Sequence, residues 1–233
     1  MNGVIFFIVL PYLALFSLVF GSIYRYFYKG FEISSLSSQI LESRLLFLGN
    51  RPFHWGIITL LIGHMIGLLI PAGVLAWNGK PVRLYILEIT AFAFGLLALI
   101  GFIVLVTRRI DVKRIRRVTT KMDILVYVVL AAIIVTGLST AFFVRWGSSW
   151  FAMVMAPYLK SILFFRPDAS AVVALPVLAK IHIISTFTFF LIFPFTRFIH
   201  ILVYPFSYFV REYQVVIWNK RNKVDPVTQK DKK

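Results

Sequence analysis

Long apolar runs separated by short polar segments dominate this 233-residue chain. At 1.5 Å per residue, a helix of about 20 residues crosses the roughly 30 Å hydrocarbon layer of a membrane. Lipid offers the backbone no hydrogen-bond partner, so each crossing must be helical. The pattern predicts an all-α integral membrane protein with five transmembrane helices, at Gly3–Gly21, Phe53–Leu75, Tyr85–Val106, Ile124–Val144 and His182–Val203.

Three of the connecting or terminal segments are amphipathic or aromatic, and they predict short helices at the membrane surface. A sixth crossing near residues 150–165 is disfavoured because it would be short and interrupted by Pro157 and Lys160. The predicted interfacial helices are Ser34–Phe47, an aromatic helix from Trp146 to Tyr158, and Phe206–Trp218.

Local signals also predict where individual helices begin and bend. Asn50, followed by Pro52, is typical of an N-cap and first turn, and would begin the second helix. Asp123 is placed to begin the fourth helix. Pro194 lies inside the fifth run and should kink it.

Charge predicts the orientation of the chain. The net charge is +16, from 25 Lys and Arg against nine Asp and Glu. Most basic residues fall in segments on one side of the predicted membrane, so the positive-inside rule predicts a cytoplasmic C-terminus and an outside N-terminus. This basic face suits anionic lipid headgroups and requires no nucleic-acid partner. The basic residues on the opposite side are Lys80, Arg83, Arg145, Lys160, Arg166 and Lys180.

Composition also limits the chemistry. The chain has no cysteine, which excludes disulfides, iron–sulfur ligation and covalent c-type haem attachment within it. We expect one membrane domain over residues 1–218, followed by a charged cytoplasmic tail over residues 219–233.

All four histidines fall in only two of the predicted helices. An ionisable side chain inside a membrane is costly and is therefore a functional-site candidate. Histidine is also the usual axial ligand of haem iron. His54 and His64 lie in the second helix, and His182 and His200 lie in the fifth.

The two histidine-bearing helices should run antiparallel, which pairs their histidines by depth. His54 is then level with His200, and His64 with His182, so that each pair could hold one b-type haem between helices two and five. The spacings are about 15 Å along the second helix and about 27 Å along the fifth. Tilt, or a kink at Pro194, would have to absorb this difference.

Other readings of the intramembrane polar residues remain open. The histidines of a haem-free membrane anchor would serve only packing. A proton-coupled transporter usually carries intramembrane carboxylates, and Glu88 is the single acidic residue within a predicted span. A shared zinc site is disfavoured because the four histidines are too far apart. Gly56, Gly63 and Gly67 could admit a macrocycle, although by themselves they more often indicate helix packing.

Several polar residues are candidate contacts for the cofactors. Five residues are candidates to bind the propionates of the inner haem: Arg25, Tyr26, Ser38, Arg109 and Arg197. Arg83, one of few basic residues near the outer pair, could bind a quinone carbonyl or a propionate. Each of these residues also has a simpler explanation. It could fix the orientation of the chain in the membrane, or extend its polar end to the lipid headgroups.

Four stretches of this chain resemble the gamma subunit of respiratory nitrate reductase, a di-haem cytochrome b membrane subunit. The resemblance covers most of the chain. The matching text is Ser37-Ser38-Gln39, P-F-H-W-G…G-H-M-I-G around His54 and His64, T-T-x-x-D-I-L at Thr119–Leu125, and F-P-F-T-R-F-I-H ending at His200.

This resemblance implies a prokaryotic cytoplasmic-membrane subunit that oxidises menaquinol or ubiquinol and passes the electrons through two b haems. It implies that His54 and His200 hold the proximal haem, and His64 and His182 the distal haem near the quinol site. Arg83 aligns with the family's quinol-site lysine. An iron–sulfur subunit and a molybdenum catalytic subunit would be the partners. Similar membrane subunits serve sulfite-reduction and heterodisulfide-type complexes, so other terminal acceptors stay open.

Overall fold

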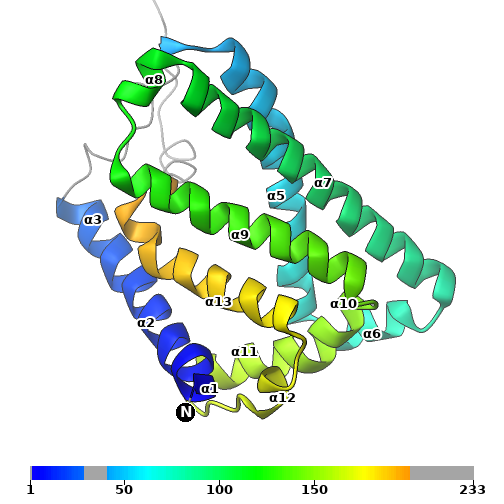
Figure 1. Cartoon of the computed structure of the whole chain (residues 1–233). Helices are drawn as coiled ribbons and strands as arrows, with labels where there is room; N and C mark the ends of the chain where they lie inside the picture. Colours follow the sequence, from blue (N-terminus) through cyan, green and yellow to red (C-terminus); the bar gives the residue numbers. More distant parts are fainter. Residues whose placement is uncertain (1, 29–40, 200–233) are drawn as a thin grey trace, which may run out of the picture.

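The computed structural model describes residues 2–28 and 41–199, and this part of the chain is helical, without strands (Figure 1). Five helical segments in it are long and apolar enough to cross a membrane, as the hydrophobic pattern predicts. They are Ile5–Tyr28, Arg44–Leu69, Pro81–Asp111, Lys121–Phe143 and Val177–Phe195.

Short irregular turns interrupt the first and last of these segments. The first consists of two π-helical turns, α2 and α3, and is preceded by α1. The last changes from α13 to the 3-10 turn η5. The bounds are α1 (Asn2–Val4), η1 (Ile5–Val9), α2 (Leu10–Phe16), η2 (Ser17–Gly21), α3 (Ser22–Tyr28), α5 (Arg44–Leu69), α6 (Pro71–Asn78), α7 (Pro81–Asp111), α8 (Lys113–Arg117), α9 (Lys121–Phe143), α13 (Val177–Ile192), η5 (Phe193–Phe195) and η6 (Arg197–Ile199).

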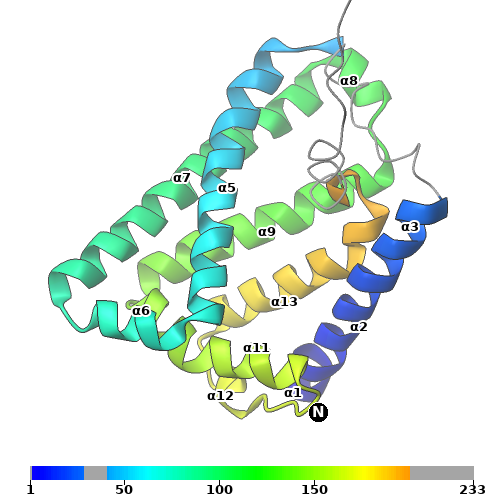
Figure 2. The ribbon, with the colours of Figure 1, turned by 180° about the vertical axis from the view of Figure 1, so that it is seen from behind.

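The long helices form an up-and-down arrangement in which α5 packs along α7, and α13 packs between α9 and α2. Helix α7 also packs against α9, which joins the two groups. Figures 1 and 2 show the two ends of this arrangement, one carrying α8 and the other carrying α6 and α11. We refer to them as the α8 end and the α11 end. Helices α5 and α13 run in opposite directions between these ends.

The segment between α9 and α13 forms a short helix across the α11 end (Figure 2). It comprises α10 (Gly147–Trp150), the π-helical turn η4 (Phe151–Met155) and α11 (Ala156–Leu163), followed by α12 (Ser170–Val173). Tyr158 donates a hydrogen bond to the carbonyl of Phe7 at 2.8 Å. Its ring lies in one buried cluster with Phe7, Met155 and Phe187. The predicted aromatic helix is therefore present, and it closes this end of the bundle.

Glycines bring α5 and α7 into backbone contact. A Cβ atom on Gly56 would lie 2.6 Å from the amide nitrogen of Ala98, and one on Gly101 would lie 2.3 Å from that of Phe53. Real Cβ atoms do not approach so closely, so both positions require glycine if the helices are to stay this near. Gly56 thus serves helix packing, which is the reading that the glycine pattern favoured.

The second long helix begins earlier than the sequence indicated. It starts at Arg44, so Asn50 is not its N-cap and Pro52 lies inside the helix. The carboxylate of Glu42 accepts hydrogen bonds from the amides of Leu45 and Leu46, and these satisfy N–H groups of the first turn. Four residues of the predicted interfacial helix 34–47 are therefore the start of α5, and residues 34–40 lie outside the described part.

Helix α5 ends at Leu69, six residues before the predicted end of its run at Leu75. Ile70 leaves the helical conformation at φ −126° and ψ 58°, and Pro71 begins the separate helix α6. The predicted run to Leu75 is therefore divided between two helices. Proline suits the first turn of α6 because it lacks the N–H that would have no partner there.

Pro194 ends the last α-helix instead of kinking it. Helix α13 stops at Ile192, and the chain continues through the 3-10 turns η5 and η6. The proline has no N–H to bond the carbonyl four residues earlier, and its ring crowds that carbonyl. The predicted fifth helix, His182–Val203, is therefore not a continuous α-helix beyond Ile192.

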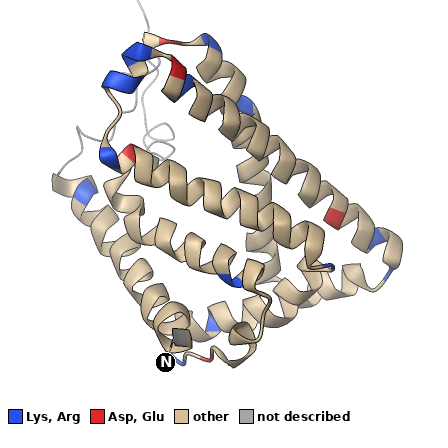
Figure 3. Ribbon diagram, in the orientation of Figure 1, with Lys and Arg blue, Asp and Glu red and all other residues tan. Residues whose placement is uncertain are grey.

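Basic residues gather at the α8 end (Figure 3). Helix α8 alone carries Lys113, Arg114, Arg116 and Arg117. This arrangement matches the charge asymmetry on which the predicted orientation rests. The orientation itself, the helix expected at 206–218 and the domain boundary at 218 stay predictions, because residues 200–233 lie outside the described part.

An ion pair joins Glu42, two residues before the start of α5, to Arg108 in the last turns of α7. Arg108 donates from Nε to Oε2 of Glu42 and from Nη2 to the Glu42 carbonyl, both at 2.7 Å. The two side chains are 4% and 18% exposed. Burial of the Glu42 carboxyl acts to raise its pKa, but the Leu45, Leu46 and Arg108 hydrogen bonds outweigh it, so the pKa lies below its ordinary value.

We expect Glu42→Gln to lower the free energy of unfolding at neutral pH by about 2 kcal/mol, because it removes a charge-assisted bond to a buried guanidinium. The depressed pKa means that wild-type Glu42 stabilises the fold above the ordinary carboxyl range. This contribution is lost as the pH falls through the folded-state pKa. Thermal unfolding in detergent across pH 3–7 should show the two proteins converging in acid. Asp111→Asn, an exposed substitution at the same end, should stay close to wild type throughout.

Candidate functional site

His64 on α5 and His182 on α13 face each other across the bundle. Their ring centroids are 6.5 Å apart and the ring planes are inclined by 34°. The two residues are 118 positions apart in the sequence, and the antiparallel course of the two helices brings them to the same depth. The predicted pairing of these two histidines is present in the fold.

Each of the three described histidines presents Nδ1 to a backbone carbonyl. The acceptors are Asn50 for His54 at 2.9 Å, Leu60 for His64 at 2.7 Å, and Ile133 for His182 at 3.0 Å. A carbonyl only accepts, so the proton of each neutral imidazole resides on Nδ1. Nε2 then keeps its lone pair, which is the arrangement found in histidines that bind metals.

The separation of His64 and His182 fits one metal ion between them. With metal–nitrogen bonds of about 2.0 Å, and each nitrogen about 1.1 Å from its ring centre, two opposed imidazoles have centroids about 6.2 Å apart. The described residues contain no group of three or more His, Cys, Asp or Glu that could hold a metal ion. Two opposed imidazoles without further protein ligands fit haem, whose porphyrin supplies the other donors.

The surroundings of His64 also fit a flat macrocycle. A Cβ on Gly63 would have no atom within 4 Å, whereas one on Gly67 would meet the ring of Phe151 at 2.8 Å. Phe151 lies edge-on to the His64 ring with centroids 5.2 Å apart. Space is therefore open beside His64 on the Gly63 side, and Phe151 bounds the His64 ring near the α11 end.

Only one member of the second predicted pair is described. His54 lies on α5 towards the α8 end, half-buried, with its ring edge-on to Phe53 at 5.7 Å. His200 lies outside the described residues, so its pairing with His54 stays a prediction.

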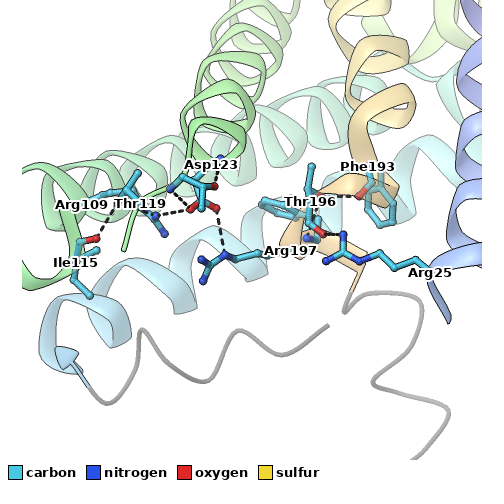
Figure 4. A network of polar contacts seen from close by, with 10 residues as sticks. Arg25, Arg109, Ile115, Thr119, Asp123, Phe193, Thr196 and Arg197 are labelled. Atoms are coloured by element: carbon cyan, nitrogen blue, oxygen red, sulfur yellow. Dashed lines mark hydrogen bonds and ion pairs between the residues drawn. The ribbon is translucent and has the colours of Figure 1, made fainter. Parts of the chain in front are cut away.

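A polar network organises the chain immediately before His200 (Figure 4). Asp123 forms a capping box with Thr120 at the start of α9, which confirms the expected helix start. Its carboxylate also binds Arg109 at 3.2 Å and Arg197 at 3.3 Å. Two of the stretches that carried the family resemblance thus meet at one carboxylate.

The first helical span binds the same region. Arg25 donates from Nη1 to the carbonyls of Pro194, at 2.5 Å, and Thr196, at 2.9 Å. These carbonyls lie where Pro194 ends the α-helix, so they lack regular helical partners. Arg25 thereby ties α3 to the turns η5 and η6.

The candidate propionate residues differ in their surroundings. Arg109 is held by Asp123 and by Thr119, whose hydroxyl oxygen lies 3.1 Å away. Tyr26 is 56% exposed and its ring lies edge-on to Phe27. Ser38 lies outside the described residues. Arg25, Arg109 and Arg197 therefore have structural roles, and all five propionate contacts stay predictions.

Arg83 lies beside an aromatic residue at the α11 end. Its guanidinium carbon is 5.1 Å from the ring centre of Trp77, and Trp77 donates from Nε1 to the Arg83 carbonyl at 3.2 Å. Tyr85 packs edge-on against Trp146 near the same corner. The arginine is exposed, which leaves its charged head accessible.

Glu88 has a structural explanation. Its Oε1 accepts bonds from both the amide, at 2.8 Å, and the hydroxyl, at 2.6 Å, of Ser148 in the first turn of α10. Asn78 on α6 donates to the hydroxyls of Ser148 and Ser149 at 2.9 Å. The carboxylate thus caps α10 and joins it to α7.

One partner of the histidine pair was missed by the sequence analysis. The ring of His182 contacts α9 through Ile133, Thr136 and Gly137, although α9 carries no histidine. The available signal was Thr136-Gly137, where a polar and a small residue interrupt the apolar run from Val128 to Val135.

Fold and site together define a class of helical membrane proteins in which two antiparallel spans present opposed histidines. Comparison with known families identifies the particular one. The model of the nitrate reductase gamma subunit family matches residues 3–219, and the chain belongs to this family.

Two curated relatives have the same extent as this chain. The nitrate reductase gamma chain of Bacillus subtilis is 35% identical over 226 residues, which are 95% of this chain and 100% of the relative. The respiratory nitrate reductase 2 gamma chain of Escherichia coli is 32% identical over 217 residues, covering 92% and 96% of the two chains. The similarity therefore spans the whole bundle.

Proposed function

We propose that this chain is the quinol-oxidising cytochrome b subunit of a nitrate reductase. His64 and His182 hold one b haem, and His54 and His200 hold a second. The observation that carries the proposal is the opposed pair His64–His182, 6.5 Å apart, with the Nδ1 atom of each ring bound to a backbone carbonyl. The family match favours nitrate over sulfite-reduction or heterodisulfide-type acceptors.

Bound at these histidines, the haems supply one-electron carriers between quinol and an iron–sulfur protein. The chain's own contribution is to present a neutral imidazole with a free Nε2 and to keep it in that orientation. Backbone carbonyls do this for His54, His64 and His182.

We expect about two b haems per wild-type chain, and one in His64→Ala or His182→Ala, because each variant removes an axial ligand of the same haem. A reduced-minus-oxidised spectrum and a pyridine haemochrome assay of the purified protein measure this. Thr188→Val on α13 should keep both haems. A folded wild-type preparation without a Soret band would return the chain to the haem-free anchor class.

We also propose that Arg83 binds the quinol headgroup. An exposed guanidinium can donate to a quinone oxygen, and the contact with Trp77 steadies its side chain. The alignment of Arg83 with the family's quinol-site lysine supports this role.

For Arg83→Gln we expect about a tenfold rise in the KM for quinol, since a charge-assisted hydrogen bond of about 1.5 kcal/mol is lost. Arg83→Lys keeps a cation and should recover most of the affinity. Quinol-dependent haem reduction by the complex is the assay, and Lys80→Gln, an exposed cation in the same connection, is the control. Equal effects of Arg83→Gln and Lys80→Gln would remove Arg83 from the site.

The α8 end is proposed to face the cytoplasm and to bind the iron–sulfur subunit, with the molybdenum subunit beyond it. Its basic residues satisfy the positive-inside rule. They also leave a charged surface on which an acidic partner could bind.

The absence of native cysteine makes this topology directly testable. We expect a membrane-impermeant maleimide to label Arg166→Cys in spheroplasts, and to label Lys113→Cys only after the membrane is permeabilised. Both residues are exposed and lie at opposite ends of the bundle. The reverse pattern would invert the proposed orientation.

A further inference from the structure

The described histidines are oriented in two different ways. His54 and His64 each bind the carbonyl of the residue four positions earlier in their own helix. His182 instead binds a carbonyl of a different helix, Ile133 on α9. Its ring orientation therefore depends on how α13 packs against α9.

A second group on α9 contacts the same nitrogen. The hydroxyl oxygen of Thr136 lies 3.4 Å from Nδ1 of His182. This hydroxyl donates its own proton to the carbonyl of Ala132 at 2.5 Å. With its proton engaged there, the oxygen offers a lone pair to the His182 N–H, so that this N–H is shared between Thr136 and Ile133.

The next residue makes room for the ring. A Cβ on Gly137 would lie 2.9 Å from Cε1 and 3.2 Å from Nδ1 of His182. Any side chain at this position would push the imidazole away from α9 and lengthen both of its hydrogen bonds. Ile133, Thr136 and Gly137 lie within about one turn of α9. Together they form the surface against which the His182 ring packs.

We propose that Thr136 is a positioning residue for the distal haem ligand: it accepts from Nδ1–H of His182 and thereby sets the ring orientation and the basicity of Nε2. This inference rests on the proposed function. An acceptor on Nδ1 makes Nε2 a stronger electron donor. Removing the Thr136 hydroxyl should therefore weaken this donation, favour the ferrous state and raise the midpoint potential of the distal haem alone.

The alternative is that Thr136 only bonds back to its own helix, as threonines in apolar helices commonly do. The chain contains a matched example of that behaviour. Thr188 on α13 donates to the carbonyl of Ile184 at 2.8 Å and is half-buried like Thr136. A threonine-to-valine change at each position therefore separates loss of a back-bonded hydroxyl from loss of the His182 contact.

The experiment is a potentiometric titration of both haems in the intact complex, followed by optical and electron paramagnetic resonance spectra. We expect Thr136→Val to raise the potential of the distal haem and to leave that of the proximal haem unchanged. Thr136→Ser, which restores the hydroxyl, should return the distal potential towards wild type. Thr188→Val should change neither haem.

Gly137→Ala provides a second measurement of the same contact between α9 and the His182 ring. We expect it to displace His182 and to remove one of the two haems, whereas Gly95→Ala on α7 meets only the movable end of Leu138 and should keep both. An unchanged distal potential in Thr136→Val, or equal shifts in Thr136→Val and Thr188→Val, would overturn the inference. These outcomes are distinct from failure of the proposed function, in which the wild-type complex contains no haem at these histidines.

Discussion

Inside a hydrocarbon layer every polar group must find its partner within the protein, and this constraint organises the whole bundle. The backbone meets it by forming helices. The three described histidines meet it with backbone carbonyls, which leaves Nε2 as the atom available to a metal. Glu88 meets it by capping α10, and Thr136 by bonding to Ala132 and His182. The same requirement thus produces the helical fold and sets the orientation of the described histidine rings.

Helix packing then decides which polar groups meet. Close contact of α5 with α7 at Gly56 and Gly101 leaves the His64 face of α5 turned towards α13. Packing of α13 on α9 gives His182 its hydrogen-bond partners. The site therefore depends on four helices, although only two of them carry histidine.

The two ends of the bundle are built differently. At the α8 end, ion pairs of Asp123 with Arg109 and Arg197, and of Glu42 with Arg108, connect helix termini. At the α11 end, aromatic and aliphatic side chains around Tyr158 join the first span to the short helices. Ion pairs between helix termini thus hold the α8 end together, whereas a buried apolar cluster joins the elements of the α11 end.

The sequence by itself determined the helical class, the five spans and the histidine pair His64–His182, because hydrophobic run length and residue depth depend on local composition and helix rise alone. It could not place the start of α5, where the Glu42 carboxylate bonds the first turn, or the end of α13 at Ile192. It also missed the contact of Thr136 and Gly137 with His182. The end of α13 is a local effect of Pro194. Glu42 is held beside α5 by Arg108, 66 positions away, and His182 meets Thr136 across 46 positions. Only the tertiary structure decides which of these distant groups meet.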